Sequence, residues 1–188
     1  LAASGAQVTA VDLSANRLKR LAGNLDRLKL DAHLVRADIL EWQPDEPFDA
    51  VLLDAPCSAT GTIRRHPDIA CLKSPEDIAT LAALQARMLA RAADWVKPGG
   101  QLVYCTCSLE PEEGEYQAAA LVAGRSDYTI EPVRAEEIGG LEEAVNSDSC
   151  LRTLPFMNFE TTSAETGQDH DGSKGMDGFF AARFRRSG

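Results

Sequence analysis

Two cysteines of the sequence stand where a thiol could act as a nucleophile. Cys57 follows Asp54 by three residues at the end of an apolar run, and Cys107 ends a second such run. The thiolate is the reactive form of cysteine, and a helix N-terminus favours it. Because a predicted helix follows Cys107, we expect Cys107 to be the better nucleophile. Cys57 is equally well explained as a small buried side chain.

Acidic residues also end predicted strands. Asp12, Asp38 and Asp54 each close a short apolar run. In open α/β sheets the carboxyl ends of parallel strands gather at one edge, and ligands bind there. A single strand-end acid would be interpreted as a cap, but the ordered set leads us to expect that these acids and Cys107 line one site.

The segment between Asp54 and Thr62 has the composition of a shaped loop. Pro56 fixes the backbone and lacks an N–H donor, and Gly61 permits an unusual turn. The loop is therefore expected to hold the Asp54 carboxylate and the Cys57 thiol in a defined arrangement.

Alternating periodicities predict the elements that position these residues. Strands are expected at 7–12, 32–35, 48–54, 101–107 and 178–184, and helices at 15–30, 75–96 and 112–123. Ser14 and Ser74 are predicted N-caps, and Lys97-Pro98-Gly99-Gly100 is predicted to end the second helix. The polar segment 160–177 is predicted to be a long loop. Strands alternating with helices indicate an α/β fold with a mostly parallel, doubly wound sheet.

Length and cysteine content narrow the class of protein. The 188 residues suit one domain, and no apolar run approaches the roughly 18 residues that span a bilayer, so no membrane partner is expected. Five cysteines are an odd number, which disfavours a disulfide framework and favours a reducing, cytoplasmic location. Only Cys105 and Cys107 form a close pair, so no metal site is expected.

The net charge of −10 disfavours nucleic acid as a partner when it is taken alone. Local basic clusters exist at Arg64-Arg65-His66 and at Arg183, Arg185 and Arg186, and solvated surface is their simpler interpretation. His66 is expected at the surface or on a phosphate, and His170 in solvent within the predicted loop.

Both cysteine segments resemble those of the RNA 5-methylcytosine methyltransferases of the NOL1/NOP2/Sun family. Asp54-Ala55-Pro56-Cys57-Ser58 is similar to the family's Asp-x-Pro-Cys loop. Tyr104-Cys105-Thr106-Cys107-Ser108, followed by the acidic segment 110–115, is similar to its Thr-Cys segment. Segments 97–100 and 177–180 extend the resemblance over nearly the whole chain. It implies a Rossmann-like class I methyltransferase fold.

The resemblance also implies a role for each candidate residue. Cys107 would form a covalent adduct with cytosine C6, and Cys57 would help to remove the C5 proton or to release the product. Asp54 would contact ring N3, and the Pro56 carbonyl would read the exocyclic amine. The cofactor would be S-adenosylmethionine, with Asp12 on its ribose, Asp38 on its adenine and Asp54 as the third acid of its site. The partner would be RNA, with ribosomal RNA as the expected class.

One part of the family pattern is missing from the sequence. The family places a Pro-Gly-Gly-Lys loop before the strand that contains Val8, and a basic RNA-binding region further upstream. Residues 1–188 are therefore expected to be a partial methyltransferase domain that lacks its first strand, binds S-adenosylmethionine poorly alone and is inactive alone.

Two alternatives remain open from the sequence. A DNA cytosine-C5 methyltransferase would use Cys57 as the nucleophile and would not need Cys107. A non-catalytic fragment that binds RNA or another partner would need neither thiol.

Overall fold

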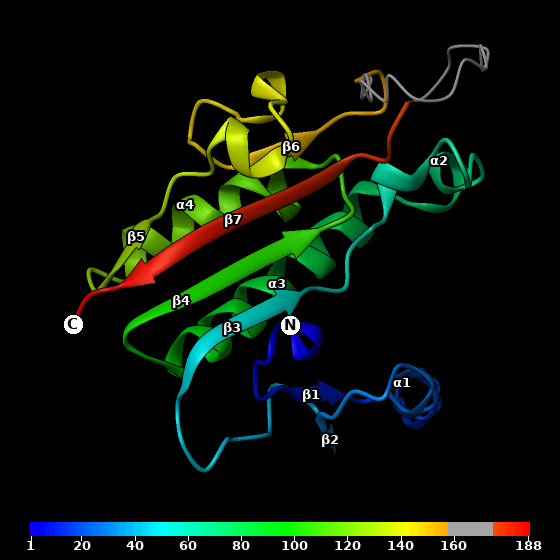
Figure 1. Ribbon diagram of the computed structural model, residues 1–188. Helices are drawn as coiled ribbons and strands as arrows, with labels where there is room; N and C mark the ends of the chain where they lie inside the picture. Colours follow the sequence, from blue (N-terminus) through cyan, green and yellow to red (C-terminus); the bar gives the residue numbers. More distant parts are fainter. Residues whose placement is uncertain (158–174) are drawn as a thin grey trace, which may run out of the picture. The chain divides into compact units, whose positions relative to one another are not determined.

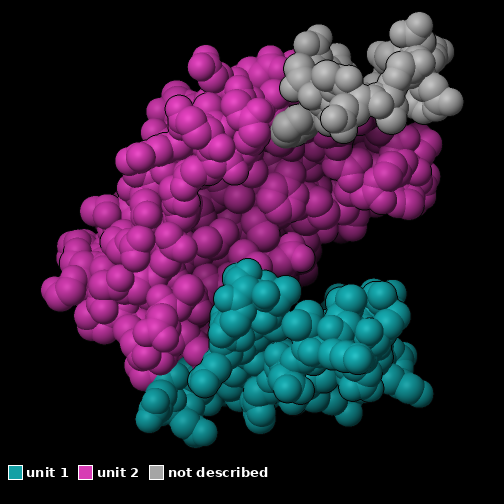
Figure 2. Space-filling model, in the orientation of Figure 1, with its two compact units in different colours: residues 1–46 teal, residues 47–188 magenta. Residues whose placement is uncertain are grey.

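The computed structural model describes residues 1–157 and 175–188. The chain divides into two compact units, Leu1–Glu46 and Pro47–Gly188, which are coloured teal and magenta in Figure 2. The predicted loop 160–177 falls almost entirely outside the described residues, and so does His170.

Unit 1 contains a parallel strand pair and one helix. Its elements are η1 (Ala2–Ser4), β1 (Thr9–Asp12), α1 (Ala15–Leu28) and β2 (His33–Arg36). The Ser14 side chain accepts a hydrogen bond from the Arg17 N–H, which confirms the predicted N-cap. Asp12 pairs with Arg36 in the parallel register, so the carboxyl ends of both strands lie at the same edge.

Unit 2 contains the larger sheet of the described chain. Its strands are β3 (Phe48–Asp54), β4 (Val96–Thr106), β5 (Tyr128–Ile130), β6 (Leu151–Thr153) and β7 (Phe179–Arg186). The spatial order is β3-β4-β7-β5, with β6 also paired to β7. The β3–β4 pair is parallel, whereas β7 runs antiparallel to its neighbours. The central strands β3, β4 and β7 lie side by side in Figure 1.

Helices α3 (Pro75–Asp94) and α4 (Glu115–Gly124) pack behind this sheet in Figure 1, whereas the short α2 (Ile69–Leu72) lies to the side of it. The 3-10 turns of unit 2 are η2 (Thr60–Thr62), η3 (Pro111–Glu113), η4 (Ala135–Ile138) and η5 (Glu142–Ala144). Ser74 caps the start of α3, which confirms the predicted N-cap, and Asp77 completes a capping box with it.

The core of unit 2 lies between the sheet and α3. Leu102, Tyr104, Phe180 and Phe184 are fully buried, and the rings of Tyr104 and Phe180 meet edge to face at 6.4 Å. This packing holds β4 and β7 together directly beside the residues that follow β4.

Two predicted boundaries were wrong. The helix predicted to run to residue 96 ends at Asp94. Residues 97–100 were predicted to end that helix, but they belong to β4. Phe48 pairs with Val96 while Ala50 pairs with Gln101, so the extra residues form a bulge, with Gly99 at φ +77°. The next helix begins at Glu115 rather than 112, because the preceding residues form the η3 turn.

Candidate active site

The two cysteine segments meet at the carboxyl ends of β3 and β4. Asp54 pairs with Cys105 in the parallel register, and the Ala55 N–H donates to the Cys105 carbonyl at 3.0 Å. Both strands therefore end at the same edge, and the loop after Asp54 runs alongside the residues that follow Thr106. The sequence prediction that Asp54 and Cys107 lie together is consistent with this register.

A pair of thiols occupies this edge. The sulfurs of Cys57 and Cys107 are 3.5 Å apart although the residues are 50 positions apart in the chain. The hydrogen bond that the Cys57 thiol gives to Cys107 lowers the Cys107 pKa to about 7, against the opposing effect of burial. The same contact, together with burial, raises the pKa of Cys57. Of the two thiols, Cys107 therefore ionises first, and about half of it is thiolate near neutral pH while Cys57 holds its proton.

The physical cause of the lowered pKa differs from the one expected from sequence. The helix after Cys107 was expected to favour the thiolate, but α4 begins only at Glu115 and the main cause is the Cys57 hydrogen bond. The nearby Asp54 and Asp177 carboxylates act in the opposite direction and raise the Cys107 pKa.

Cys105 is chemically different from its neighbour Cys107. Its side chain is buried, and its sulfur lies 3.9 Å from Asp54 Oδ1. Burial and the Asp54 carboxylate raise the pKa of Cys105 to about 12. It is therefore protonated at neutral pH and is not a candidate nucleophile.

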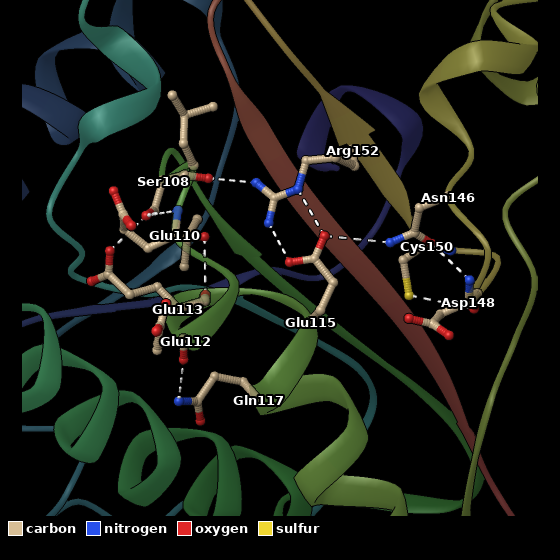
Figure 3. A network of polar contacts seen from close by, with 12 residues as sticks. Ser108, Glu110, Glu112, Glu113, Glu115, Gln117, Asn146, Asp148, Cys150 and Arg152 are labelled. Atoms are coloured by element: carbon tan, nitrogen blue, oxygen red, sulfur yellow. Dashed lines mark hydrogen bonds and ion pairs between the residues drawn. The ribbon is translucent and has the colours of Figure 1, made fainter.

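Buried polar side chains support both cysteine loops. Glu113 is fully buried. Its carboxyl group accepts one hydrogen bond from the Ser58 N–H at 2.9 Å and another from the Ser108 hydroxyl at 2.6 Å. Figure 3 shows the Glu113 carboxyl group pointing toward Ser108. The residues that immediately follow the two cysteines are thus joined through one carboxyl group.

The Pro56 carbonyl, a predicted base-reading group, has a protein partner. Gln85 Nε2 donates to it at 2.8 Å and also to Glu113 Oε1 at 2.9 Å. The Tyr104 hydroxyl donates to Gln85 Oε1 at 3.2 Å, which fixes the orientation of the amide. A carbonyl oxygen has two lone pairs, so Pro56 retains acceptor capacity for a base.

Close backbone contacts join the Cys57 loop to the start of β7. The Gly61 N–H donates to the Cys107 carbonyl at 3.0 Å, and Gly178 N–H donates to the Gly61 carbonyl at 2.7 Å. A Cβ at Gly61 would come within 2.0 Å of the Gly178 carbonyl oxygen, so this approach requires glycine. Arg65 donates through Nε to Asp177 at 2.9 Å, which adds an ion pair to the same junction.

The two predicted cofactor acids lie at one edge of unit 1. Asp12 Oδ1 accepts from the Ser14 N–H at 2.7 Å and from Arg17 Nε at 3.1 Å. Asp38 is exposed, and its Oδ1 accepts from the Leu40 N–H at 2.9 Å. The Ala37 N–H donates to the Asp12 carbonyl at 3.3 Å, so the segments that carry these acids are adjacent. Asp12 and Asp38 belong to a different unit from Asp54, Cys57 and Cys107.

The three arginines of the basic cluster on β7 form ion pairs with acidic side chains. Arg183 pairs with Glu137 at 3.0 Å, Arg185 with Glu131 at 2.8 Å and Arg186 with Asp127 at 3.0 Å. These side chains serve as structural ion pairs in unit 2. His66 and Arg64 of the other cluster are exposed.

The sequence prediction missed the residues that support the thiols. Glu113, Gln85, Ser58 and Ser108 were not identified as site residues. One signal was present, because both cysteines are followed by serine in the sequence. Glu113 lay within the acidic segment 110–115 that the resemblance included, although no role was assigned to it, whereas Gln85 had no comparable signal.

Three further properties of residues 1–157 and 175–188 concern disulfides, metal-ligand clusters and membrane-spanning helices. All five cysteines are free. In the described part of the chain, no cluster of three His, Cys, Asp or Glu side chains is arranged to hold a metal ion. No described helix is long and apolar enough to cross a membrane.

Comparison with known proteins gives a consistent set of similarities. The family model for the 16S rRNA methyltransferase RsmB/F matches residues 1–185. The chain is 39% identical over 184 residues to ribosomal RNA small subunit methyltransferase B of Shewanella oneidensis. That alignment covers 96% of this chain but 38% of the relative, so the chain spans well under half the length of that protein.

Solved structures show the same relationship. NSun6 from Pyrococcus horikoshii, determined with SFG, superposes with a TM-score of 0.73 at 25% identity, over 97% of this chain and 42% of that one. A methyltransferase homologue from Pyrococcus horikoshii gives a TM-score of 0.69 at 30% identity, over 96% of this chain and 53% of that one. These matches confirm the Rossmann-like methyltransferase fold expected from the sequence.

Proposed function

The chain belongs to the RsmB/F family of 16S rRNA methyltransferases, and from this premise we propose that it is the catalytic part of an RNA cytosine-C5 methyltransferase that uses S-adenosylmethionine. The observation that carries the proposal is the thiol pair, with Cys57 and Cys107 3.5 Å apart and the Cys107 pKa lowered to about 7. Ribosomal RNA is the proposed substrate, because the curated relative is named for it.

Cys107 is the proposed nucleophile. Cytosine C5 is a weak nucleophile until a thiolate adds to C6, when a new S–C6 bond forms and electron density moves into the ring toward N3 and C5. Covalent addition of this kind splits one difficult step into easier ones. A thiol with a pKa near the ambient pH combines a large thiolate fraction with good intrinsic nucleophilicity.

Cys57 has the complementary role. It keeps its proton while it donates to the Cys107 thiolate, because that contact and burial raise its pKa. Once the Cys107 sulfur is bonded to C6, the negative charge that held this proton has left the sulfur, so Cys57 can release the proton to solvent. We propose that the Cys57 thiolate then takes up the C5 proton, and that the electron pair of the C5–H bond expels Cys107 from C6 as a thiolate.

Asp54 and the Pro56 carbonyl are the proposed base-recognition groups. Asp54 is exposed at the end of β3, where a proton shared between its carboxyl group and ring N3 would offset the negative charge that develops on N3 during addition. Pro56 would accept from the exocyclic amine with the lone pair that Gln85 does not use.

The residues of unit 1 fit part of the proposed cofactor. S-adenosylmethionine, when bound, supplies an activated methyl group. Asp12 offers a carboxylate that the Ser14 N–H and Arg17 hold in place, which suits ribose hydroxyl donors. Asp38 offers an exposed carboxylate on the adjacent segment, which suits the adenine amine. Asp54, the third predicted acid of the cofactor site, lies in unit 2. A cytoplasmic location accords with a ribosomal RNA substrate in bacteria.

The test separates this proposal from the DNA-type alternative. In the complete natural protein that carries this chain, Cys107→Ala is expected to abolish the covalent adduct with 5-fluorocytosine-containing RNA in the presence of S-adenosylmethionine. Cys71→Ala is the control, because Cys71 is an exposed cysteine of α2. Denaturing gel electrophoresis detects the adduct.

Two outcomes would overturn the assignment. Loss of the adduct from Cys57→Ala with full adduct formation by Cys107→Ala would favour the DNA-type mechanism. Absence of any adduct or methyl transfer by the complete protein would favour a non-catalytic binding role.

A further inference from the structure

Glu113 of η3 is a buried acid that the proposed chemistry does not use directly. Its side chain has no exposed surface. Its backbone is also held, because its carbonyl accepts hydrogen bonds from the Tyr104 hydroxyl at 2.7 Å and the Thr106 hydroxyl at 3.2 Å. The carboxyl group therefore projects from a fixed point of the core.

The donors that Glu113 gathers come from both cysteine loops. From the first loop, the Ser58 N–H donates to Oε1 at 2.9 Å, and the Ser58 hydroxyl donates to Oε2. From the second, the Ser108 hydroxyl donates to Oε2 at 2.6 Å (Figure 3). The two hydroxyls are themselves 3.2 Å apart. Each serine directly follows a cysteine of the thiol pair.

Burial of this acid costs free energy unless hydrogen bonds from the protein replace those that its carboxyl group made to water. Among residues 1–157 and 175–188, the hydrogen-bond donors to its carboxyl group are Ser58, Ser108 and Gln85, all neutral. A buried carboxyl group without a cationic partner needs a full set of donors to offset the loss of water. Here that set consists of groups whose positions determine where Cys57 and Cys107 lie.

We propose that Glu113 is a positioning residue, which holds the Cys57 and Cys107 loops together and thereby sets the distance between the two sulfurs. The inference deepens the proposed function, on which its relevance to catalysis rests. Glu113 acts on the two cysteines through its hydrogen bonds with Ser58 and Ser108.

A change in sulfur separation has a measurable chemical consequence. The Cys57 hydrogen bond is the main cause of the lowered Cys107 pKa. If the loops move apart, that bond weakens, while the Asp54 and Asp177 carboxylates still favour the neutral thiol. The Cys107 pKa is then expected to rise toward that of an ordinary cysteine.

The experiment uses the 188-residue chain and needs neither RNA nor cofactor. Two properties are measured, the pH midpoint of Cys107 alkylation by iodoacetamide, read by peptide mass spectrometry, and the affinity for phenylarsine oxide, which binds two adjacent thiols. Glu113→Ala should raise the midpoint by at least one pH unit and weaken phenylarsine oxide binding at least tenfold. Glu113→Gln should be intermediate, because it keeps the length and one acceptor oxygen.

Glu112→Ala is the matched control, because Glu112 is the exposed neighbour in the same turn. It should leave both properties at wild-type values. Wild-type values in a Glu113→Ala protein with a cooperative thermal transition would overturn the proposal, and so would an equal change in Glu112→Ala.

A milder pair of variants covers the case in which Glu113→Ala does not fold. Ser58→Ala and Ser108→Ala each remove one hydroxyl donor and keep the buried acid. Each should raise the midpoint by about half a pH unit, and wild-type behaviour of both would overturn the proposal. Failure of the proposed methyl transfer would leave these thiol measurements unchanged, so the two failures are distinguishable.

Discussion

At the residue scale, Cys57 and Cys107 differ because of what surrounds them. Cys57 is the proton donor of the pair, and burial adds to the rise of its pKa. Cys107 accepts that hydrogen bond and has a pKa of about 7. Two thiols 3.5 Å apart thus have pKa values shifted in opposite directions, which suits a nucleophile and a proton-holding helper.

Removing the donor should weaken the nucleophile. Cys57→Ala is expected to raise the Cys107 pKa from about 7 toward its ordinary value of 9.0, because the stabilising hydrogen bond is lost. The thiolate fraction at pH 7 would then fall about 50-fold, partly offset by the greater intrinsic nucleophilicity of a more basic thiolate, for a net loss of about fivefold in alkylation rate.

The measurement is the rate of Cys107 alkylation against pH, followed by mass spectrometry. Cys71→Ala should leave the profile unchanged, because Cys71 is exposed and is not among the causes of the shift. A midpoint that stays near 7 in Cys57→Ala would show that another group stabilises the thiolate.

At the element scale, a half-buried ion pair joins β6 to the start of α4. Arg152 Nε donates to Glu115 Oε1 at 2.9 Å, and Nη1 donates to the Ser108 carbonyl at 2.5 Å. The guanidinium also lies over the Phe180 ring at 4.9 Å. Although burial opposes it, Arg152 holds the pKa of Glu115 below its usual value. Figure 3 shows the forked contact.

Loss of this ion pair should destabilise unit 2. Arg152→Met keeps most of the side-chain volume but leaves Glu115 without its cation, and the side chains of the two are only 10% and 23% exposed. The expected cost is about 3 kcal/mol in the free energy of unfolding. Urea denaturation followed by circular dichroism measures it.

Lys97→Met is the matched control for that measurement. Its ion pair with Asp49 is solvent-exposed, with the Asp49 side chain at 90%, so its loss should change the free energy of unfolding far less than the loss of Arg152 does. Equal losses in the two variants would mean that burial does not strengthen the Arg152 pair.

At the scale of the whole molecule, the proposed cofactor contacts and the thiols belong to separate compact units. Asp12 and Asp38 lie in unit 1, whereas Asp54 and both thiols lie in unit 2. The chain also spans 38% of the curated relative that it matches over nearly its whole length. Activity is therefore proposed for the complete protein.

The isolated chain should bind S-adenosylmethionine only weakly. The cofactor contacts proposed on unit 1 are two carboxylates, and neither would hold the methionine part of the molecule. Isothermal titration calorimetry is expected to give a Kd well above the micromolar range. Micromolar binding that Asp12→Ala abolishes would contradict this expectation and would show that the chain contains a sufficient site.

The sequence by itself determined the local structure and the chemical inventory of this protein. The strand 48–54 and the capped start of α3 follow from periodicity and from Ser74-Pro75, because hydrogen bonds and side-chain spacing within a few residues decide such elements. Asp54, Cys57 and Cys107 were visible as strand-end residues for the same reason. Residues 97–100 were misassigned, because a bulge depends on the partner strand.

Only the tertiary structure decided which of these residues meet. The 3.5 Å contact between Cys57 and Cys107 depends on the parallel pairing of β3 with β4, which no local pattern specifies. The supporting role of Glu113 arises in the same way, because its donors come from two loops far apart in the chain. The state of a thiol depends on distances of a few ångströms, and those distances exist only after distant segments have packed together.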